Sequence, residues 1–157
     1  MEENIYQTPK APLTTPEPAK GSPIKAILIA TIVDIGGTLM VGFLISMGYI
    51  VIQTSKGVPT KQAIKHLGQM ELYAPVSLLG LALGFAITLY AGYLCAKIAQ
   101  RSIYRVVTVF SIIIIGFSIM MTVSYYSVLE HILLNMLALF SAYLGAWWYV
   151  HTKAQAR

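Results

Sequence analysis

The sequence predicts an all-α integral membrane protein, an antiparallel bundle of four transmembrane helices preceded by a disordered proline-rich tail. Of its 157 residues, 57% are hydrophobic and only 11% are charged, whereas about 25% are charged in an ordinary soluble domain. The apolar residues gather in four runs, each long enough to cross a bilayer. The basic residues that give the chain its formal charge of +5 lie mostly at or beyond the ends of those runs.

Residues 1–23 are expected to form a disordered cytoplasmic tail. They hold five of the seven prolines among Thr, Lys and Glu, so the segment lacks backbone donors and has no apolar face to bury. The run from Pro9 to Pro12 fits the P-x-x-P pattern of ligands for proline-reading domains. Such a short pattern is common in proline-rich tails, and a plain tether is the favoured interpretation.

Residues 24–152 form the predicted membrane domain, and 153–157 form a second cytoplasmic tail. At 1.5 Å per residue, the apolar runs measure roughly 28 to 42 Å, enough to cross the roughly 30 Å hydrocarbon layer. The predicted spans cover about 25–52, 74–97, 106–127 and 132–150. Short links at 99–102 and at 129–131 make sequential spans antiparallel neighbours.

The longest predicted segment outside the membrane between two spans is 53–73. Within it, residues 59–72 begin with a proline, and Ala63, Ile64 and Leu67 follow helical spacing. This pattern predicts a short amphipathic helix lying on the outer surface of the membrane. An irregular polar loop is the alternative, because Gly68 weakens the helical pattern.

The distribution of Lys and Arg predicts the orientation of the chain. Eight of them belong to the side that holds both tails and the 98–105 turn, and three belong to the other side, at Lys56, Lys61 and Lys65. The positive-inside rule then places both termini in the cytoplasm. Because these charges flank apolar runs, anionic headgroups account for them, and no nucleic-acid partner is expected.

Small residues spaced by four predict where the helices touch, since helices in lipid associate through close packing and hydrogen bonds. The second span has one such stripe, and the first and fourth spans have others. They are Gly80, Gly84, Thr88, Gly92 and Ala96; Ala26, Ala30, Asp34, Thr38, Gly42 and Ser46; and Ala138, Ala142 and Ala146. Each stripe is expected to serve either the bundle or a seam between two copies.

Asp34 is the most informative polar residue of the sequence. It lies nine residues after Lys25, roughly 13 Å deep, where a charge costs on the order of 2.5 to 3.5 kcal/mol. One interpretation is a proton or cation site. The favoured one is a neutral carboxyl group, hydrogen-bonded across a helix interface. The candidate partners on the other spans are Thr88, Tyr90, Ser111, Ser118 and Ser141, and Thr38 shares the stripe of Asp34.

Other chemistry-bearing residues form no recognised pattern. His66, Glu71, Glu130 and His131 lie on the predicted outer side without a metal-ligand spacing, so no metal and no cofactor are expected. No nucleophile and base pair or phosphate loop is visible, and the chain is not expected to be an enzyme. The single Cys95 excludes an intramolecular disulfide and is expected to be a small buried residue.

Two stretches resemble known proteins. Leu78 to Ser102 is similar to the glycine-rich second span, ending in a Gly-Tyr-x-x-Ala-Arg type boundary, of small bacterial four-span membrane proteins that are mostly uncharacterised; Ala91 and Lys97 stand where a second glycine and an arginine are commoner. Asn4 to Leu13 resembles the Asn-x-Tyr-x-x-Pro leader of many proteobacterial inner-membrane proteins. The resemblance implies a location in the bacterial inner membrane.

The sequence leaves two classes of function open. The leading hypothesis is a non-enzymatic accessory or assembly partner of another membrane component. The alternative is a small oligomeric transporter or channel that uses Asp34 as its proton or cation site. The small multidrug resistance family also combines four spans with an acidic residue in the first. However, its dual insertion requires near-equal charge on both sides, and eight basic residues against three oppose that analogy.

Overall fold

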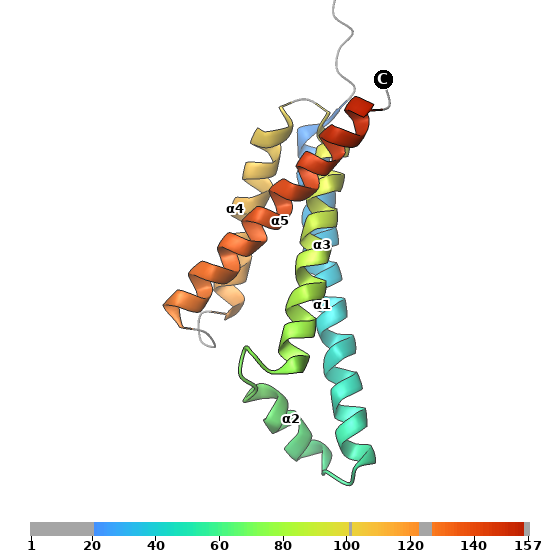
Figure 1. Cartoon of the computed structure of the whole chain (residues 1–157), viewed down its shortest axis with the longest axis vertical. Helices are drawn as coiled ribbons and strands as arrows, with labels where there is room; N and C mark the ends of the chain where they lie inside the picture. The colour runs from blue at the N-terminus through green and yellow to red at the C-terminus, as the bar shows by residue number, and fades with distance from the viewer. Residues whose placement is uncertain (1–20, 101, 123–126, 156–157) are drawn as a thin grey trace, which may run out of the picture.

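The computed structural model describes residues 21–100, 102–122 and 127–155 and consists of five helices (Figure 1). They are α1 (Pro23–Ser55), α2 (Thr60–Gly68), α3 (Pro75–Ala99), α4 (Ile103–Thr122) and α5 (Val128–Gln155). All but α2 are long and apolar enough to cross a membrane. The fold class predicted from the sequence, an all-α bundle with four membrane spans, is therefore confirmed. Most of the predicted tail, residues 1–20, lies outside the described residues.

Local sequence signals explain where the first and third helices begin. Ser22 precedes α1, and its hydroxyl accepts a hydrogen bond from the backbone N–H of Lys25 at 3.5 Å. Pro23 and Pro75 stand in the first turns of α1 and α3, where a proline removes an N–H that has no helical partner. After α3 the backbone of Gln100 takes a left-handed conformation, with φ of 50°, and this ends the helix.

The boundary between the third and fourth spans differs from the prediction. The link was expected at 129–131, but these residues belong to the first turn of α5. Ser127 Oγ accepts from the N–H of Glu130 at 3.3 Å, while Glu130 Oε2 accepts from the N–H of Ser127 at 2.8 Å. This reciprocal pair is a capping box, which starts a helix regardless of the polar character of its first turn.

Other helix ends extend past the predicted limits, namely both ends of α1, the beginning of α4 and the ends of α3 and α5, whereas α3 begins at Pro75, one residue after its predicted start. Hydropathy marks the part of a helix inside the hydrocarbon, whereas the hydrogen-bonded helix continues into the polar region. Thus α1 begins at Pro23 and ends at Ser55, and α5 continues to Gln155 through most of the predicted C-terminal tail. The short α2 forms within the predicted 59–72 segment and packs against α1, with Ala63 fully buried.

The four long helices alternate in direction (Figure 1). We call the end where α1 begins and α5 ends the terminal end, and the opposite end, which carries α2, the α2 end. The central helix is α3, because the two most extensive contacts between helices are those of α3 with α5 and of α3 with α1. Toward the α2 end, α4 and α5 diverge from α1 and α3, which continue beyond them (Figure 1).

The buried residues concentrate in the part of the bundle nearest the terminal end, which we call the closed half. It comprises α1 up to Asp34, α3 from Thr88, α4 up to Ile114 and α5 from Ser141. Its core is made mainly of small side chains with a few larger ones. The fully buried hydrophobic members are Ala26, Ala30, Ala91, Cys95, Ala96, Ala99, Val107, Phe110, Ala142 and Ala146.

The closest backbone approach in the closed half joins α3 to α5. A Cβ atom added at Gly92 would collide with the backbone of Ala142, whose Cα would be 2.9 Å away. A Cβ added at Gly145 would collide with the carbonyl of Leu89 and lie 2.8 Å from the backbone nitrogen of Tyr93. Glycine is therefore required at both positions, because two helix backbones touch there.

Aromatic side chains add to the packing of the closed half. Tyr93 of α3 makes edge contacts with Tyr149 and Trp148 of α5, with ring centroids 5.6 and 6.5 Å apart. On the other side of α5, the Tyr143 hydroxyl is 2.6 Å from Thr108 Oγ1 of α4. These contacts fix α5 to both of its neighbours in the closed half.

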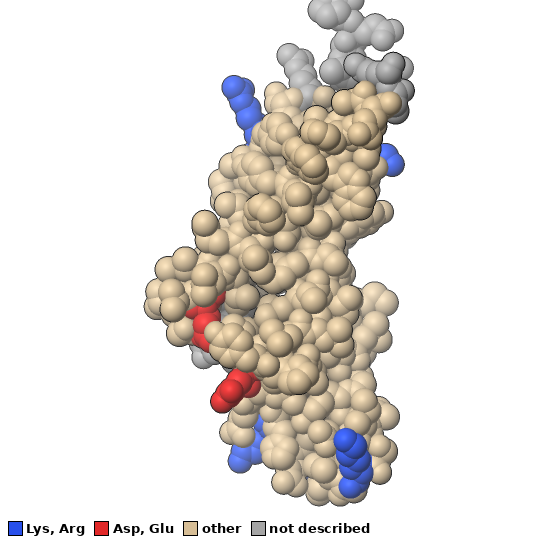
Figure 2. Space-filling model, viewed as in Figure 1, with Lys and Arg blue, Asp and Glu red and all other residues tan. Residues whose placement is uncertain are grey.

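The rest of the molecule, which we call the open half, buries few side chains. Figure 2 shows a face with Lys and Arg toward its two ends and a broad uncharged stretch between the upper basic residues and the acidic side chains below. Large apolar side chains of α1, such as Met40, Phe43 and Val51, are exposed there. Such a surface suits the acyl chains of a bilayer.

Candidate functional site

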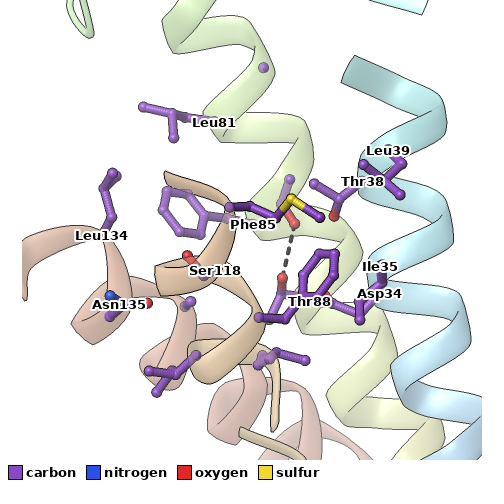
Figure 3. Close-up of a pocket in the computed structure, with 17 residues that line it drawn as sticks. Asp34, Ile35, Thr38, Leu39, Leu81, Phe85, Thr88, Ser118, Leu134 and Asn135 are labelled. Carbon is purple, nitrogen blue, oxygen red and sulfur yellow. Dashed lines mark hydrogen bonds between the residues drawn. The ribbon is translucent and has the colours of Figure 1, made fainter. Parts of the chain in front are cut away.

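A cavity of about 370 Å³ lies between the four long helices at the start of the open half (Figure 3). Each span contributes to its wall, and most of the wall is apolar. The lining includes two aromatic rings, Phe85 and Phe117. Five polar side chains also line it: Asp34 and Thr38 of α1, Thr88 of α3, Ser118 of α4 and Asn135 of α5.

Among the described residues that line the cavity, Asp34 is the only acidic one, and 7% of its surface is exposed. Its Oδ1 atom is fully buried and makes no hydrogen bond with any residue in the described ranges. A buried carboxyl oxygen without a partner is costly, by about 1–3 kcal/mol. An interhelical hydrogen bond therefore accounts for at most one of the two oxygens of Asp34.

Thr88 of α3 is a hydrogen-bonding partner of the Asp34 carboxyl across the α1–α3 interface. The dashed line in Figure 3 marks another bond of Thr88, the one to the Gly84 carbonyl. In that bond Thr88 Oγ1 donates to the carbonyl oxygen of Gly84 at 3.1 Å. A hydroxyl has a single hydrogen, so with that hydrogen on Gly84 it offers Asp34 only a lone pair. Asp34 can bond to that lone pair only when its carboxyl carries a hydrogen.

Two of the candidate partners predicted for Asp34 reach the cavity. Thr88 is buried beside Asp34, and Ser118 lines the wall from α4. The other three do not: Ser111 and Ser141 are buried in the closed half, and Ser141 donates to Leu137 within its own helix at 2.9 Å. Tyr90, which was predicted as a site residue, is 54% exposed and stacks on Tyr93. None of Ser111, Ser141 and Tyr90 lines the cavity.

The sequence pattern did not single out Asn135 as a site residue, although it is a polar residue within an apolar run. Its amide donates to the carbonyl oxygen of His131 at 2.8 Å, one turn back in α5. Asn135 and Ile115 also line a second cavity of about 440 Å³ between α4 and α5, which reaches His131 near the beginning of α5. The signal was present, because an amide inside a membrane span is uncommon unless it faces the protein interior.

The predicted packing stripes divide between the two halves of the molecule. Gly92 and Ala96 are buried, and Gly92 lies against Ala142 of α5. By contrast, Gly84 would have nothing within 4 Å of an added Cβ, and Gly80 would have only Ile45 at 3.8 Å; both glycines line the cavity. Gly42 also has open space around it. Small residues thus close the bundle at one end and leave room at the other.

The described ranges contain no group of three His, Cys, Asp or Glu side chains arranged to hold a metal ion. Cys95 is fully buried in the closed half. Comparison with protein families, with characterised proteins and with solved structures finds no match for this chain. Any assignment of function therefore rests on the cavity and on the residues around it.

Proposed function

We propose that this four-span membrane protein binds a proton or a small organic cation at Asp34 and belongs to the transport class of membrane proteins. The observation that carries the proposal is the cavity shared by all four spans, with a buried carboxyl oxygen that no described residue satisfies. Ionisable residues inside a membrane typically mark ion or substrate pathways.

The composition of the wall supports a ligand that is apolar apart from one positive or hydrogen-bond-donating group. Asp34 supplies a carboxyl group that gains a negative charge when it loses its hydrogen. Phe85 and Phe117 supply aromatic rings on the same wall, and such rings attract organic cations through their faces. Release of the Asp34 proton and arrival of a cation would then exchange one positive charge for another without leaving a bare carboxylate.

The test measures proton-coupled flux of the purified protein in liposomes, with tetraethylammonium as the probe cation under an imposed pH gradient. We expect uptake with the native chain and none with Asp34→Asn, because an amide cannot exchange a proton. Asp34→Asn keeps the size and polarity of the side chain, so its melting temperature in detergent should stay close to that of the native protein.

Glu130→Gln is the matched control, because it neutralises a carboxylate that caps α5 and lies outside the cavity. Flux is expected to persist in this variant. Equal flux in folded Asp34→Asn and in the native protein, for protons and for the cation, would overturn the proposal.

The assembly role predicted from the sequence is a second candidate, supported by the space around the small residues of the open half. An added Cβ at Gly36, Gly42 or Gly48 of α1 would meet nothing within 4 Å, and small residues at uncovered positions suit close approach by another helix. Gly42→Leu should then remove a protein that co-purifies in gentle detergent, or change the size of a homo-oligomer, without unfolding the chain. Unchanged composition and size would eliminate this candidate.

We further propose a bacterial inner-membrane location with both termini in the cytoplasm, from the resemblance and from the Lys and Arg count. In the structure Lys25 and Lys97 lie toward the terminal end, whereas Lys56, Lys61 and Lys65 lie toward the α2 end. Reporter fusions after Arg157 and beside Lys61 test the orientation. Periplasmic activity of the first fusion or cytoplasmic activity of the second would reverse it.

A further inference from the structure

We propose that water fills the cavity at Asp34 and enters it from one side only. The entry is the second cavity, between α4 and α5, which we call the groove, and the water passes Asn135. This inference rests on the proposed function, for which it supplies the entry path. Asn135 then lies where the path from the groove reaches the cavity at Asp34.

The cavity at Asp34 and the groove adjoin. Ile115 of α4 and Asn135 of α5 line both the cavity at Asp34 and the groove that reaches His131. In Figure 3 the labelled polar side chains follow one another across the view, from Asn135 through Ser118 and Thr88 toward Asp34. Each belongs to a different helix, so the polar row crosses the whole bundle.

The row of polar side chains needs water and has room for it. Asp34 Oδ1 makes no hydrogen bond with a described residue, and a buried polar atom in that state normally has a water partner. A water molecule occupies about 30 Å³ in the liquid, so a cavity of about 370 Å³ holds several. The Asn135 amide and the Ser118 hydroxyl are polar groups to which such molecules can bind.

The side of Asp34 that faces the terminal end is closed. One turn and two turns before it, α1 carries Ala30 and Ala26, both fully buried. On α3 the corresponding residues toward the terminal end are Gly92, which touches Ala142, and the fully buried Ala96. Water therefore does not reach Asp34 through the closed half, and the lining shared by the two cavities leaves the groove as the proposed path.

The experiment measures how fast single cysteines react with a charged methanethiosulfonate that does not dissolve in hydrocarbon. The reagent is applied to both faces of the membranes, so the result does not depend on the orientation of the chain. A thiol reacts as the thiolate, which forms in contact with water. The native chain, whose one cysteine is fully buried in the closed half, gives the background rate.

Asn135→Cys is expected to react about tenfold faster than Leu133→Cys, because only the former contacts water and can form the thiolate. Leu133 is 58% exposed, lines neither cavity and lies two residues closer to the beginning of α5, so depth alone would favour the control. Ile115→Cys against the lipid-facing Ile112→Cys repeats the comparison on α4 and serves if Asn135→Cys does not fold.

A second pair tests whether the path reaches Asp34. Thr88→Cys should react with the charged reagent, whereas Ser111→Cys, fully buried in the closed half, should not. Reaction of Asn135→Cys and Ile115→Cys only with a lipid-soluble maleimide would show that acyl chains fill the groove and would overturn the inference. An unreactive Thr88→Cys beside a reactive Asn135→Cys would overturn it as well, since the cavities would then be separate. Neither readout measures flux, so the entry path and the proposed function can fail independently.

Discussion

The same small-residue stripes run through the closed and open halves of this protein, but they have different roles in the two halves. In the closed half, Ala30 of α1, Gly92 of α3 and Ala142 of α5 are in contact with neighbouring helices or fully buried. In the open half, the same stripes continue as Thr38, Gly84 and Ala138, and these residues line the cavity. The stripes do not change in character along the helices, but the distance between the helices does.

This comparison shows that a row of small residues permits close approach without compelling it. In lipid no hydrophobic force draws helices together, so close packing must be matched by side chains on the facing helix. Gly145 provides that match for α3 in the closed half. In the open half, Phe85 and Phe117 project toward the space between the helices and line it, and a cavity remains.

The largest effect is expected from adding a methyl group where the backbones touch. Gly92→Ala and Gly145→Ala should each destabilise the protein by about 3 kcal/mol, the upper part of the usual range for overpacking, because the Cβ collides with backbone atoms of the facing helix. Thermal melting in detergent checks this, with the helical circular dichroism as the signal. Melting temperatures equal to that of the native protein would show that α3 and α5 are not in contact.

An intermediate effect is expected at the beginning of α5, in the open half. Ser127→Ala removes the hydroxyl that accepts from the Glu130 N–H and should cost about 1 kcal/mol. Ser127→Thr keeps the capping oxygen and is the control. If the two variants melt at the same temperature, the capping box does not set the start of α5.

A smaller effect is expected from Tyr143→Phe in the closed half. Thr108 Oγ1 donates to the Tyr104 carbonyl at 2.8 Å, so the Tyr143 hydroxyl is the donor to Thr108. Its removal should cost about 0.5 kcal/mol, near the lower end for a hydrogen bond, because the site is exposed. The stacking of Tyr143 on Tyr104 is retained by Phe. Comparison of Tyr143→Phe with Tyr143→Ala separates the two contributions, and equal losses would contradict this assignment.

The smallest effect on stability is expected from Gly84→Ala, since an added Cβ there meets nothing within 4 Å. Its melting temperature should lie close to that of the native protein, in contrast to Gly92→Ala on the same stripe. The larger Gly84→Leu should occupy part of the cavity and lower flux while the chain stays folded. A Gly84→Ala variant as unstable as Gly92→Ala would show that another helix packs closely against α3 at Gly84.

The sequence predicted the helices well because hydropathy and length determine membrane spans almost alone. It misplaced the start of α5, since Glu130 and His131 are polar and the hydropathy pattern treated them as a link, whereas the capping box keeps them helical. The candidate site was predicted in part. Asp34 and Thr88 share a facing position on two stripes, but whether Tyr90 or Asn135 joins them depends on the rotation of α3 and α5, which spacing alone does not determine.

The packed layer between Asp34 and the terminal end also determines where a membrane potential acts on this protein. About 13 Å of helix separates Lys25 from Asp34 at 1.5 Å per residue, and small buried side chains fill that layer. With water in the cavity, most of the voltage falls across this layer, since water has a far higher dielectric constant than packed protein. One elementary charge moving through 100 mV gains or loses about 2.3 kcal/mol. A charge that reaches Asp34 through a water-filled cavity has therefore crossed much of the bilayer but little of its voltage, and the field is concentrated in the packed layer between Asp34 and the terminal end.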